Sequence, residues 1–179
     1  MKTLVITYLL RGEQSNTKKL VDCFLANAKN TEVEYLDLSQ KIPESFTSES
    51  LTAYMKRNYM RMELTESEKK SIHAMDELTN QLKGADVVVL AFPLYNFSMP
   101  GIVKVYFDAI LQKGETWDMK DGSYVGLMKD KKALIIMTSG GVYDGPMASW
   151  EHGISLAKLE FGFMGFKEIE SVHIGGVNM

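Results

Sequence analysis

Cysteine and proline are scarce in this chain of 179 residues. The single cysteine, Cys23, cannot form a disulfide within one chain, so a fold stapled by disulfides is excluded. Cys23 falls in a predicted helix beside Leu20 and Phe24, where we expect a buried thiol, a reactive thiol being the alternative. With 4 prolines, 45% apolar residues and 24% charged residues, the composition is that of an ordinary globular protein.

Strong charge of one sign is missing as well. The formal net charge is −3, and no run of Lys or Arg is longer than two residues, so we expect no nucleic-acid partner and no membrane partner. The 3 histidines stand apart from one another and from any Cys or Asp at metal-ligand spacing, so no metal site is expected. These absences leave a small molecule as the expected ligand.

Long apolar runs are absent too. The apolar stretch 3–10 follows a lysine and imitates a signal peptide, but it is too short to span a bilayer and no small-residue cleavage site follows it. A first buried strand explains this stretch better, and we therefore expect the protein in the cytoplasm. The length predicts one domain, 1–179, that is large enough to bury a sizeable core.

Apolar strands alternate with amphipathic helices along the chain. This alternation predicts parallel βαβ units with right-handed crossovers, and so an α/β fold in which a five-stranded parallel sheet lies between two helical layers. A long insertion with helices, 39–84, separates the second strand from the third. The expected strands are 3–8, 33–38, 86–92, 132–138 and 168–174, and the expected helices are 16–28, 101–112 and 147–163.

Two helical signals lie inside the insertion. Thr65 and Glu68 form a capping box in front of an apolar stripe that ends at Gly84, which predicts a helix there. The preceding segment 51–62 is rich in Met and Tyr. We expect an extra helix that covers core, and the alternative is a flexible flap or a subunit contact, because Met-rich surfaces adapt to varied partners.

The loop after the third predicted strand combines aromatic rings with a carboxamide. Pro93 cannot donate to a sheet and Pro100 favours an early helical position, so the two prolines bracket a loop. Open α/β sheets bind ligands at the carboxyl ends of their strands, and this loop suits a flat heterocycle with hydrogen-bonding edges. The predicted contact residues are Pro93, Leu94, Tyr95, Asn96 and Phe97.

Two further loops meet this loop if the strand order is 2-1-3-4-5, a common order of doubly wound sheets. The first predicted helix begins with hydroxyls and free N–H groups that favour a phosphate, and the glycines after the fourth strand let the backbone approach a carbonyl edge. No G-x-G-x-x-G or Walker A sequence is present, so a monophosphate fits better than a diphosphate. Each loop alone is also an ordinary turn or cap. The predicted contact residues are Arg11, Ser15, Asn16 and Thr17 in the first loop and Ser139, Gly140 and Gly141 in the third.

These three loops resemble those of the flavodoxin-fold NAD(P)H:quinone oxidoreductases, and most closely those of the FMN-dependent NADH-azoreductases. The family pattern is Ser-x-Ser at the first helix, Pro-(Met/Leu)-Tyr-Asn-Phe after the third strand and Ser-x-Gly-Gly after the fourth; residues 93–97 match it nearly letter for letter. The resemblance implies a flavodoxin-like fold, non-covalent FMN, NADH or NADPH as donor and a homodimer. It also implies ping-pong transfer of two electrons to quinones or azo compounds, centred on the flavin and without a catalytic side chain.

The resemblance also assigns roles to the loops. Amides at Asn96 and Phe97 are expected to steady the N5 side of the flavin, and amides near Ser139 to Gly141 to favour negative charge at its N1/O2 edge. Trp117 and Tyr143 are candidates for stacking against the acceptor, with burial in the core as the alternative. The alternative functions are an NAD(P)H:FMN reductase and a non-enzymatic flavodoxin-type electron carrier.

Some positions depart from the family pattern. Thr17 replaces a serine but keeps the hydroxyl, Tyr8 and Leu9 stand where the family often has a further serine, and the loop 139–141 is one residue shorter than usual. The chain ends at Met179, just past the fifth strand, where relatives continue into a helix that covers one sheet face. We expect the insertion 39–84 or a second subunit to cover that face here, and the alternative is a sheet left partly bare, which is costly.

Overall fold

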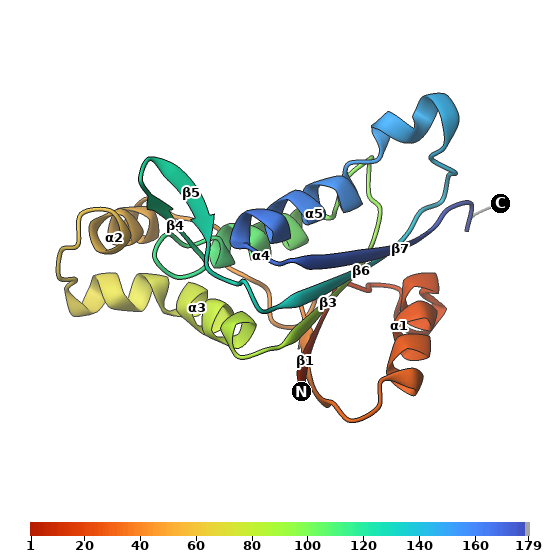
Figure 1. Ribbon diagram of the computed structural model, residues 1–179, viewed down its shortest axis with the longest axis horizontal. Coiled ribbons are helices and arrows are strands. Elements are labelled where there is room, and N and C mark those ends of the chain that lie inside the picture. The colour runs from red at the N-terminus through yellow and green to blue at the C-terminus, as the bar shows by residue number, and fades with distance from the viewer. Residues whose placement is uncertain (178–179) are drawn as a thin grey trace.

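The structure, a computed structural model that describes residues 1–177, places a parallel sheet between two unequal layers of helices (Figure 1). The five strands of the sheet are β1 (Lys2–Thr7), β2 (Glu32–Asp37), β3 (Val87–Pro93), β6 (Lys132–Thr138) and β7 (Glu168–Ile174). They lie in the order β2-β1-β3-β6-β7, with every pairing parallel. Numbered within the sheet, this is the order 2-1-3-4-5, so the predicted flavodoxin-like α/β sandwich is confirmed.

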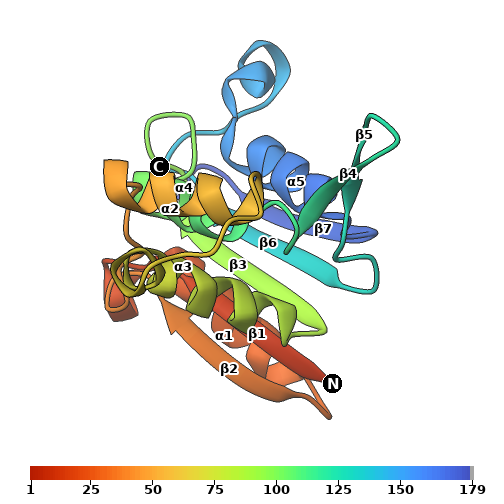
Figure 2. The same cartoon turned by 90° about the vertical axis from the view of Figure 1, so that its left-hand side faces the viewer.

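In the described part of the chain, five α-helices, two short 3-10 helices and a hairpin surround the sheet. The thin layer is α1 (Asn16–Asn27), and the thick layer contains α3 (Glu66–Lys83), α4 (Gly101–Ile110) and α5 (Gly153–Met164), as Figures 1 and 2 show. The remaining elements are η1 (Gly12–Gln14), α2 (Ser48–Asn58), η2 (Gly145–Trp150) and the hairpin strands β4 (Trp117–Lys120) and β5 (Ser123–Gly126). None of the helices within residues 1–177 has the length and apolar character needed to cross a bilayer.

The alternation of side chains along the strands divides the core in two. On β1, Leu4 and Ile6 face the thick layer, while Val5 between them faces α1. The larger core packs the sheet against α3, α4 and α5, and its fully buried side chains include Tyr106 and Phe161. The smaller core lies under α1 and consists of Val5, Val21, Val89, Ala91 and Ile136.

The insertion 39–84 extends the thick layer. Helix α2 packs beside α3, and α3 packs beside α4, on the side of the sheet opposite to α1. On the α1 side, Val172 and Ile174 of β7 are 43% and 44% exposed in the single chain. The expectation that the insertion covers this face is therefore wrong, and the second-subunit alternative stays a prediction.

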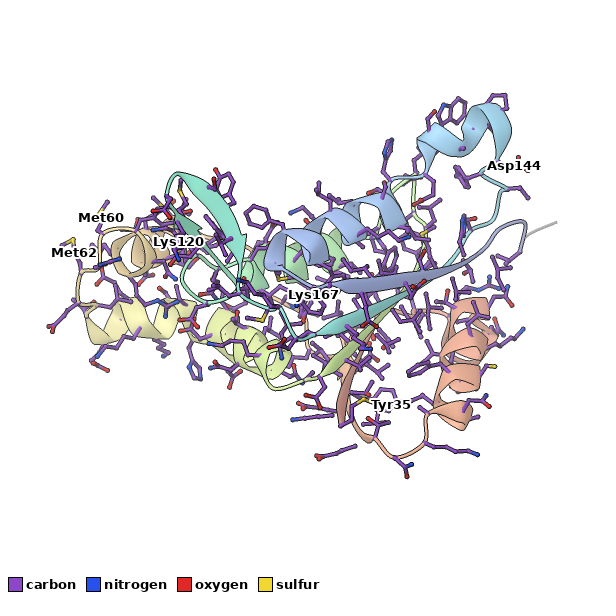
Figure 3. All side chains as sticks on the ribbon, viewed as in Figure 1. Tyr35, Met60, Met62, Lys120, Asp144 and Lys167 are labelled. Carbon is purple, nitrogen blue, oxygen red and sulfur yellow. The ribbon has the colours of Figure 1, made fainter. Side chains whose placement is uncertain are left out.

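The Met- and Tyr-rich segment forms the predicted extra helix over most of its length. Helix α2 buries Ala53 and Tyr54 against the core, and the chain leaves the helix after Asn58. Beyond that point Met60 and Met62 point outward at the end of the molecule away from the carboxyl edge of the sheet (Figure 3). The helix predicted from the capping box at Thr65 is α3, in which both reciprocal bonds of the box are present.

The continuous helix expected over 147–163 is wrong. The chain forms η2, breaks at Glu151 and His152, and restarts as α5 at Gly153. The Glu151 carboxylate accepts a hydrogen bond from the Ile154 N–H at 2.7 Å, which caps the new helix. Gly153 is needed at the restart because a Cβ there would lie 2.8 Å from Sδ of Met137.

Cys23 is exposed, so the expected buried thiol is also wrong. Helix α1 turns Val21 toward the sheet and half-buries Leu20 and Phe24. Cys23 is two residues from Val21, which is about 200° around a helix of 3.6 residues per turn. Its side chain therefore points to solvent, although its neighbours in sequence are apolar.

Candidate functional site

The three loops meet at a cavity of about 130 Å³ at the carboxyl edge of the sheet. This edge is on the right in Figure 1, where β7 ends. Eight of the twelve predicted contact residues line the cavity, and they come from all three loops. The lining residues are Leu9, Leu10, Arg11, Ser15, Asn16, Thr17, Pro93, Leu94, Tyr95, Thr138, Gly140 and Val177. The other four predicted residues, Asn96, Phe97, Ser139 and Gly141, belong to the same loops but do not line it.

The first loop presents a helix N-terminus and buried hydroxyls to the cavity. Ser15 is the N-cap of α1, and its Oγ accepts a hydrogen bond from the Lys18 N–H at 3.2 Å. Thr17 Oγ1 lies 2.7 Å from Thr138 Oγ1 in a buried hydroxyl pair. Each of the two hydroxyls carries one proton, and the hydrogen bond between them uses only one of the two. The other O–H therefore remains to donate to a ligand. Together with the helix dipole, these groups suit an anion.

Arg11 is the cation at the mouth of this cavity. Lys18 is already engaged, because its Nζ lies 2.7 Å from Asp22 Oδ2 and 3.3 Å from Glu13 Oε1. The hydrogen bond to Asp22 raises the pKa of Lys18 and fixes its charge away from the cavity. The exposed Arg11 side chain lines the cavity beside Ser15, so it is the group placed to pair with a phosphate.

The second loop is a tight elbow with a strained backbone. The N–H groups of Tyr95 and Ser98 donate to each other's carbonyls at 2.9 and 3.1 Å. Between them Asn96 and Phe97 have φ of 46° and 73°, in the left-handed region that non-glycine residues rarely adopt. The Leu94 N–H donates to the Thr138 carbonyl at 2.8 Å and ties the elbow to β6. Strain of this kind persists where the surrounding structure enforces it, and it is concentrated at functional sites.

An aromatic cluster forms on the outer side of the elbow. The Phe97 ring meets the rings of Tyr143 and Trp150 edge-on, at centroid distances of 6.3 and 6.0 Å. The His152 N–H donates to the Phe97 carbonyl at 2.8 Å. Tyr143 therefore lies beside the elbow, whereas Trp150 was missed because the sequence places it inside an expected helix.

The third loop is clamped by the segment that follows β7. The Ser139 N–H donates to the Ile174 carbonyl at 3.0 Å, and the Val177 N–H donates back to the Ser139 carbonyl at 3.1 Å. The Gly176 N–H donates to the Gly141 carbonyl at 3.1 Å. Sequence reasoning missed this segment, although the Gly-Gly pair at 175–176 signals a close backbone approach.

Free backbone donors remain in the second and third loops, although of the residues that carry them only Gly140 lines the cavity itself. Within residues 1–177, the N–H groups of Asn96, Phe97, Gly140 and Gly141 make no hydrogen bond to another backbone group. They belong to the two loops that a planar ligand would contact. Asn96 and Phe97 are exposed and the two glycines are half-buried, so these N–H groups are open to a ligand with acceptor atoms along its edges.

Trp117 lies away from the cavity. It opens β4, after α4 has run back from the cavity edge to the opposite edge of the sheet (Figure 2). Its indole N–H donates to the Leu111 carbonyl at 3.2 Å, and its ring packs against Tyr124 and Phe163 at 5.5 and 5.2 Å. At 9% exposure Trp117 is part of the core of its own chain, so the structure does not bring it together with the other predicted site residues.

A larger hollow of about 630 Å³ lies between α2 and α3. Its central cation, Arg57, is already paired with Asp76 through two hydrogen bonds of 2.6 and 2.8 Å, and with Gln112 Oε1 at 2.9 Å. The hollow contains none of the predicted site residues. We therefore assign the candidate site to the smaller cavity, which residues of all three predicted loops line.

This chain matches one family model and several known proteins in sequence. The family model for the flavodoxin-like fold matches residues 1–179. The chain is 36% identical over 172 residues to FMN-dependent NADH:quinone oxidoreductase 1 of Bacillus subtilis strain 168, a match that covers 93% of this chain and 82% of that protein. It is 31% identical over 182 residues to an FMN-dependent NADH:quinone oxidoreductase of Azotobacter vinelandii, with coverage of 99% and 89%.

The chain also superposes on solved structures of azoreductases. An azoreductase from Bacillus anthracis strain Sterne superposes with a TM-score of 0.91 at 32% identity, over 99% of this chain and 88% of that chain. An FMN-dependent NADH-azoreductase from Bacillus anthracis in complex with FMN superposes with a TM-score of 0.89 at 30% identity. This second match covers 100% of this chain and 89% of that chain, so it includes all three loops.

Proposed function

The chain belongs to the family with the flavodoxin-like fold, and from this premise we propose that the cavity at the carboxyl edge of its sheet holds FMN. It is an FMN-dependent oxidoreductase that transfers electrons from NADH to quinones or azo compounds, as the names of its relatives describe. One observation carries the assignment of the site. A helix N-terminus with buried hydroxyls, a strained aromatic elbow and a glycine loop with free amides meet at one cavity.

The residues of the cavity fit the separate parts of FMN. The N-terminus of α1, the Ser15 hydroxyl and the pair of Thr17 and Thr138 would hold the phosphate, with Arg11 at the mouth. The amides of the elbow and of the glycine loop would hold the edges of the ring. Hydrogen bonds to a neighbouring loop or strand fix the loops that carry these donors. The binding site is therefore formed before the ligand binds.

FMN supplies the redox chemistry when it is bound, accepting two electrons from NADH and delivering two to the acceptor. The protein contributes position and electrostatics. The free N–H groups at Gly140 and Gly141 would favour negative charge on a ring edge held against this loop. No side chain is required as acid or base, because the cavity mouth is open to water through the exposed Arg11 and Tyr95.

The rim of the cavity supports one shared place for NADH and then for the acceptor. Tyr95 and Phe97 are 42% and 48% exposed, so the elbow leaves aromatic surface open beside the binding site. Tyr143 packs against Phe97 at this rim and is the side chain that we propose for stacking against the acceptor. Consecutive use of one place by donor and acceptor is the ping-pong order.

A homodimer and a cytoplasmic location complete the proposal. Large apolar side chains on the hairpin and on α5 are exposed in the single chain, among them Tyr124 at 66% and Leu159 at 67%, which supports a subunit contact on that side. The cytoplasm is proposed because it is the compartment that holds the NADH consumed by the reaction.

Steady-state kinetics test this function. Protein loaded with FMN is expected to oxidise NADH rapidly when a quinone or an azo dye is present and slowly when neither is added. Double-reciprocal plots of rate against NADH at several quinone concentrations are expected to be parallel, as a ping-pong order requires. Bound FMN without NADH oxidation would indicate an electron carrier, and oxidation that requires free FMN as the acceptor would indicate an FMN reductase.

A further inference from the structure

His173 lies next to the glycine loop of the cavity. It sits near the end of β7, opposite Met137 of β6, and its side chain is half-buried on the α5 side of the sheet. Its Nε2 is 2.7 Å from Oγ of Ser139, the first residue of the glycine loop. No sequence pattern connects these two residues, which are 34 positions apart.

The surroundings of Ser139 favour one direction for this hydrogen bond. The Ser139 hydroxyl lies 2.8 Å from the Gly141 carbonyl, which can only accept. We infer that the Ser139 oxygen in turn accepts from His173, with the hydrogen on Nε2, so that Nδ1 is the nitrogen at which the ring gains or loses a proton. Both the neutral ring and the imidazolium satisfy this arrangement. The contact to the loop therefore persists while the charge on the ring changes.

Charged groups around His173 leave its charge free to act on the cavity. Strand β6 has no titratable residue between Lys132 and Thr138. At the start of α5, the Glu151 carboxylate is engaged with the Ile154 N–H. Glu170 of β7 points to the opposite face, by the alternation of the strand. The other titratable groups on the surrounding elements are His152 and Lys158 of the α5 region and Tyr143 and Asp144 of the protruding loop, where Figure 3 shows Asp144 on the outer side.

We propose that His173 is a positioning residue for the flavin, which holds the glycine loop through Ser139 and, as imidazolium, stabilises the negative charge of the reduced ring. This inference rests on the proposed function. NADH delivers two electrons and one proton to FMN, which leaves one negative charge on the ring. His173 takes up a proton from solvent at Nδ1. Its positive charge then acts across the backbone of the glycine loop and offsets the negative charge of the flavin. The ring of His173 need not touch the flavin.

Two variants separate the charge from the hydrogen bond. His173→Gln keeps an N–H donor for Ser139 but cannot ionise, and His173→Leu removes both. The measurement is the reduction potential of bound FMN at about pH 5.5 and about pH 8.5, on either side of the ordinary range of histidine. At the lower pH, wild type is expected to bind reduced over oxidised FMN about tenfold better than His173→Gln does, which is about 30 mV for a two-electron couple. At the higher pH the two are expected to agree.

A role in structure alone would not produce this pattern. His173→Gln is expected to bind oxidised FMN as wild type does, and His173→Leu to bind it more weakly at both pH values. Equal potentials for wild type and His173→Gln at both pH values, in variants with wild-type circular dichroism, would overturn the inference. If wild type itself takes up no FMN, the proposed function fails first.

An NMR titration of the wild-type protein needs no variant. The ring signals of His173 are followed against pH with oxidised and with reduced FMN bound. The midpoint of the titration is expected to move up by about one pH unit on reduction. Proton binding at His173 and reduction of the flavin favour each other, and the factor of ten must be the same in both directions. An unchanged midpoint would contradict the inference even if both variants failed to fold.

Discussion

Ser15→Asp is expected to weaken FMN binding by about 100-fold without loss of the fold. Ser15 caps α1, and aspartate is an equally good N-cap, so the hydrogen bond from the Lys18 N–H is retained. The new carboxylate lies in the cavity wall where the phosphate is proposed to bind. Two like charges about 5 Å apart in surroundings of effective dielectric constant about 20 repel by about 3 kcal/mol, which is a factor of about 100 in affinity.

Titration with FMN and with riboflavin makes this test specific. Riboflavin lacks the phosphate, so its affinity is expected to be the same for wild type and Ser15→Asp. Ser15→Ala is the matched control: it loses the cap, at a cost of about 1 kcal/mol in the free energy of unfolding, but adds no charge. An equal loss of FMN and riboflavin binding in Ser15→Asp, or no loss of either, would contradict the placement of the phosphate at α1.

Glu160→Gln is expected to stabilise the protein at pH 8 by about 1–3 kcal/mol. Glu160 lies on α5 with a side chain 8% exposed, and its Oε2 has no hydrogen-bond partner within the described residues. Lys104 Nζ is 3.5 Å from Oε1 and only partly compensates for the burial. Burial raises the pKa of Glu160 to about 7.

The pH window follows from this raised pKa. Below about pH 4.5, the carboxyl is protonated in the folded and unfolded states, and it costs the fold nothing. As pH rises toward 7, the unfolded chain ionises first, so this group lowers the stability by up to about 3 kcal/mol, and the loss is complete above pH 7. Glutamine does not ionise. The difference between Glu160→Gln and wild type is therefore expected near pH 8 and absent near pH 4.5.

Urea unfolding at the two pH values measures this difference. Glu168→Gln is the matched control, because Glu168 is 62% exposed in its ion pair with Lys132 and should show no stabilisation at pH 8. A wild-type protein as stable as Glu160→Gln at both pH values would mean that Glu160 is hydrated or paired in solution.

Sequence pattern predicted the sheet because β1, β3 and β6 are short apolar runs bounded by turns. It predicted the meeting of the loops because parallel strands bring their carboxyl ends to one edge. The features that were missed depend on tertiary contacts. The break before α5 needs the Glu151 cap and the contact of Gly153 with Met137, neither of which a helical pattern reveals. The hairpin of β4 and β5 has strands of only 4 residues, too short for an alternating pattern to be read.

The meeting of the three loops at one cavity was predicted for the same reason, and their role as a site stays a prediction. Ser15, Tyr95 and Gly140 come together because strand order alone places their loops side by side. Val177 and His173 were missed because their relation to Ser139 exists only once β6 and β7 pair. Contacts between paired strands cannot be read from the spacing of residues along the chain.

The most direct test of FMN binding and reduction at this cavity is an anaerobic titration of the purified protein, first with FMN and then with NADH, followed by the visible absorption of the flavin. We expect saturation at one FMN per chain, with a perturbed flavin spectrum, and complete bleaching by one equivalent of NADH. A protein that saturates with no FMN, or whose bound FMN is not bleached by NADH, would contradict this expectation.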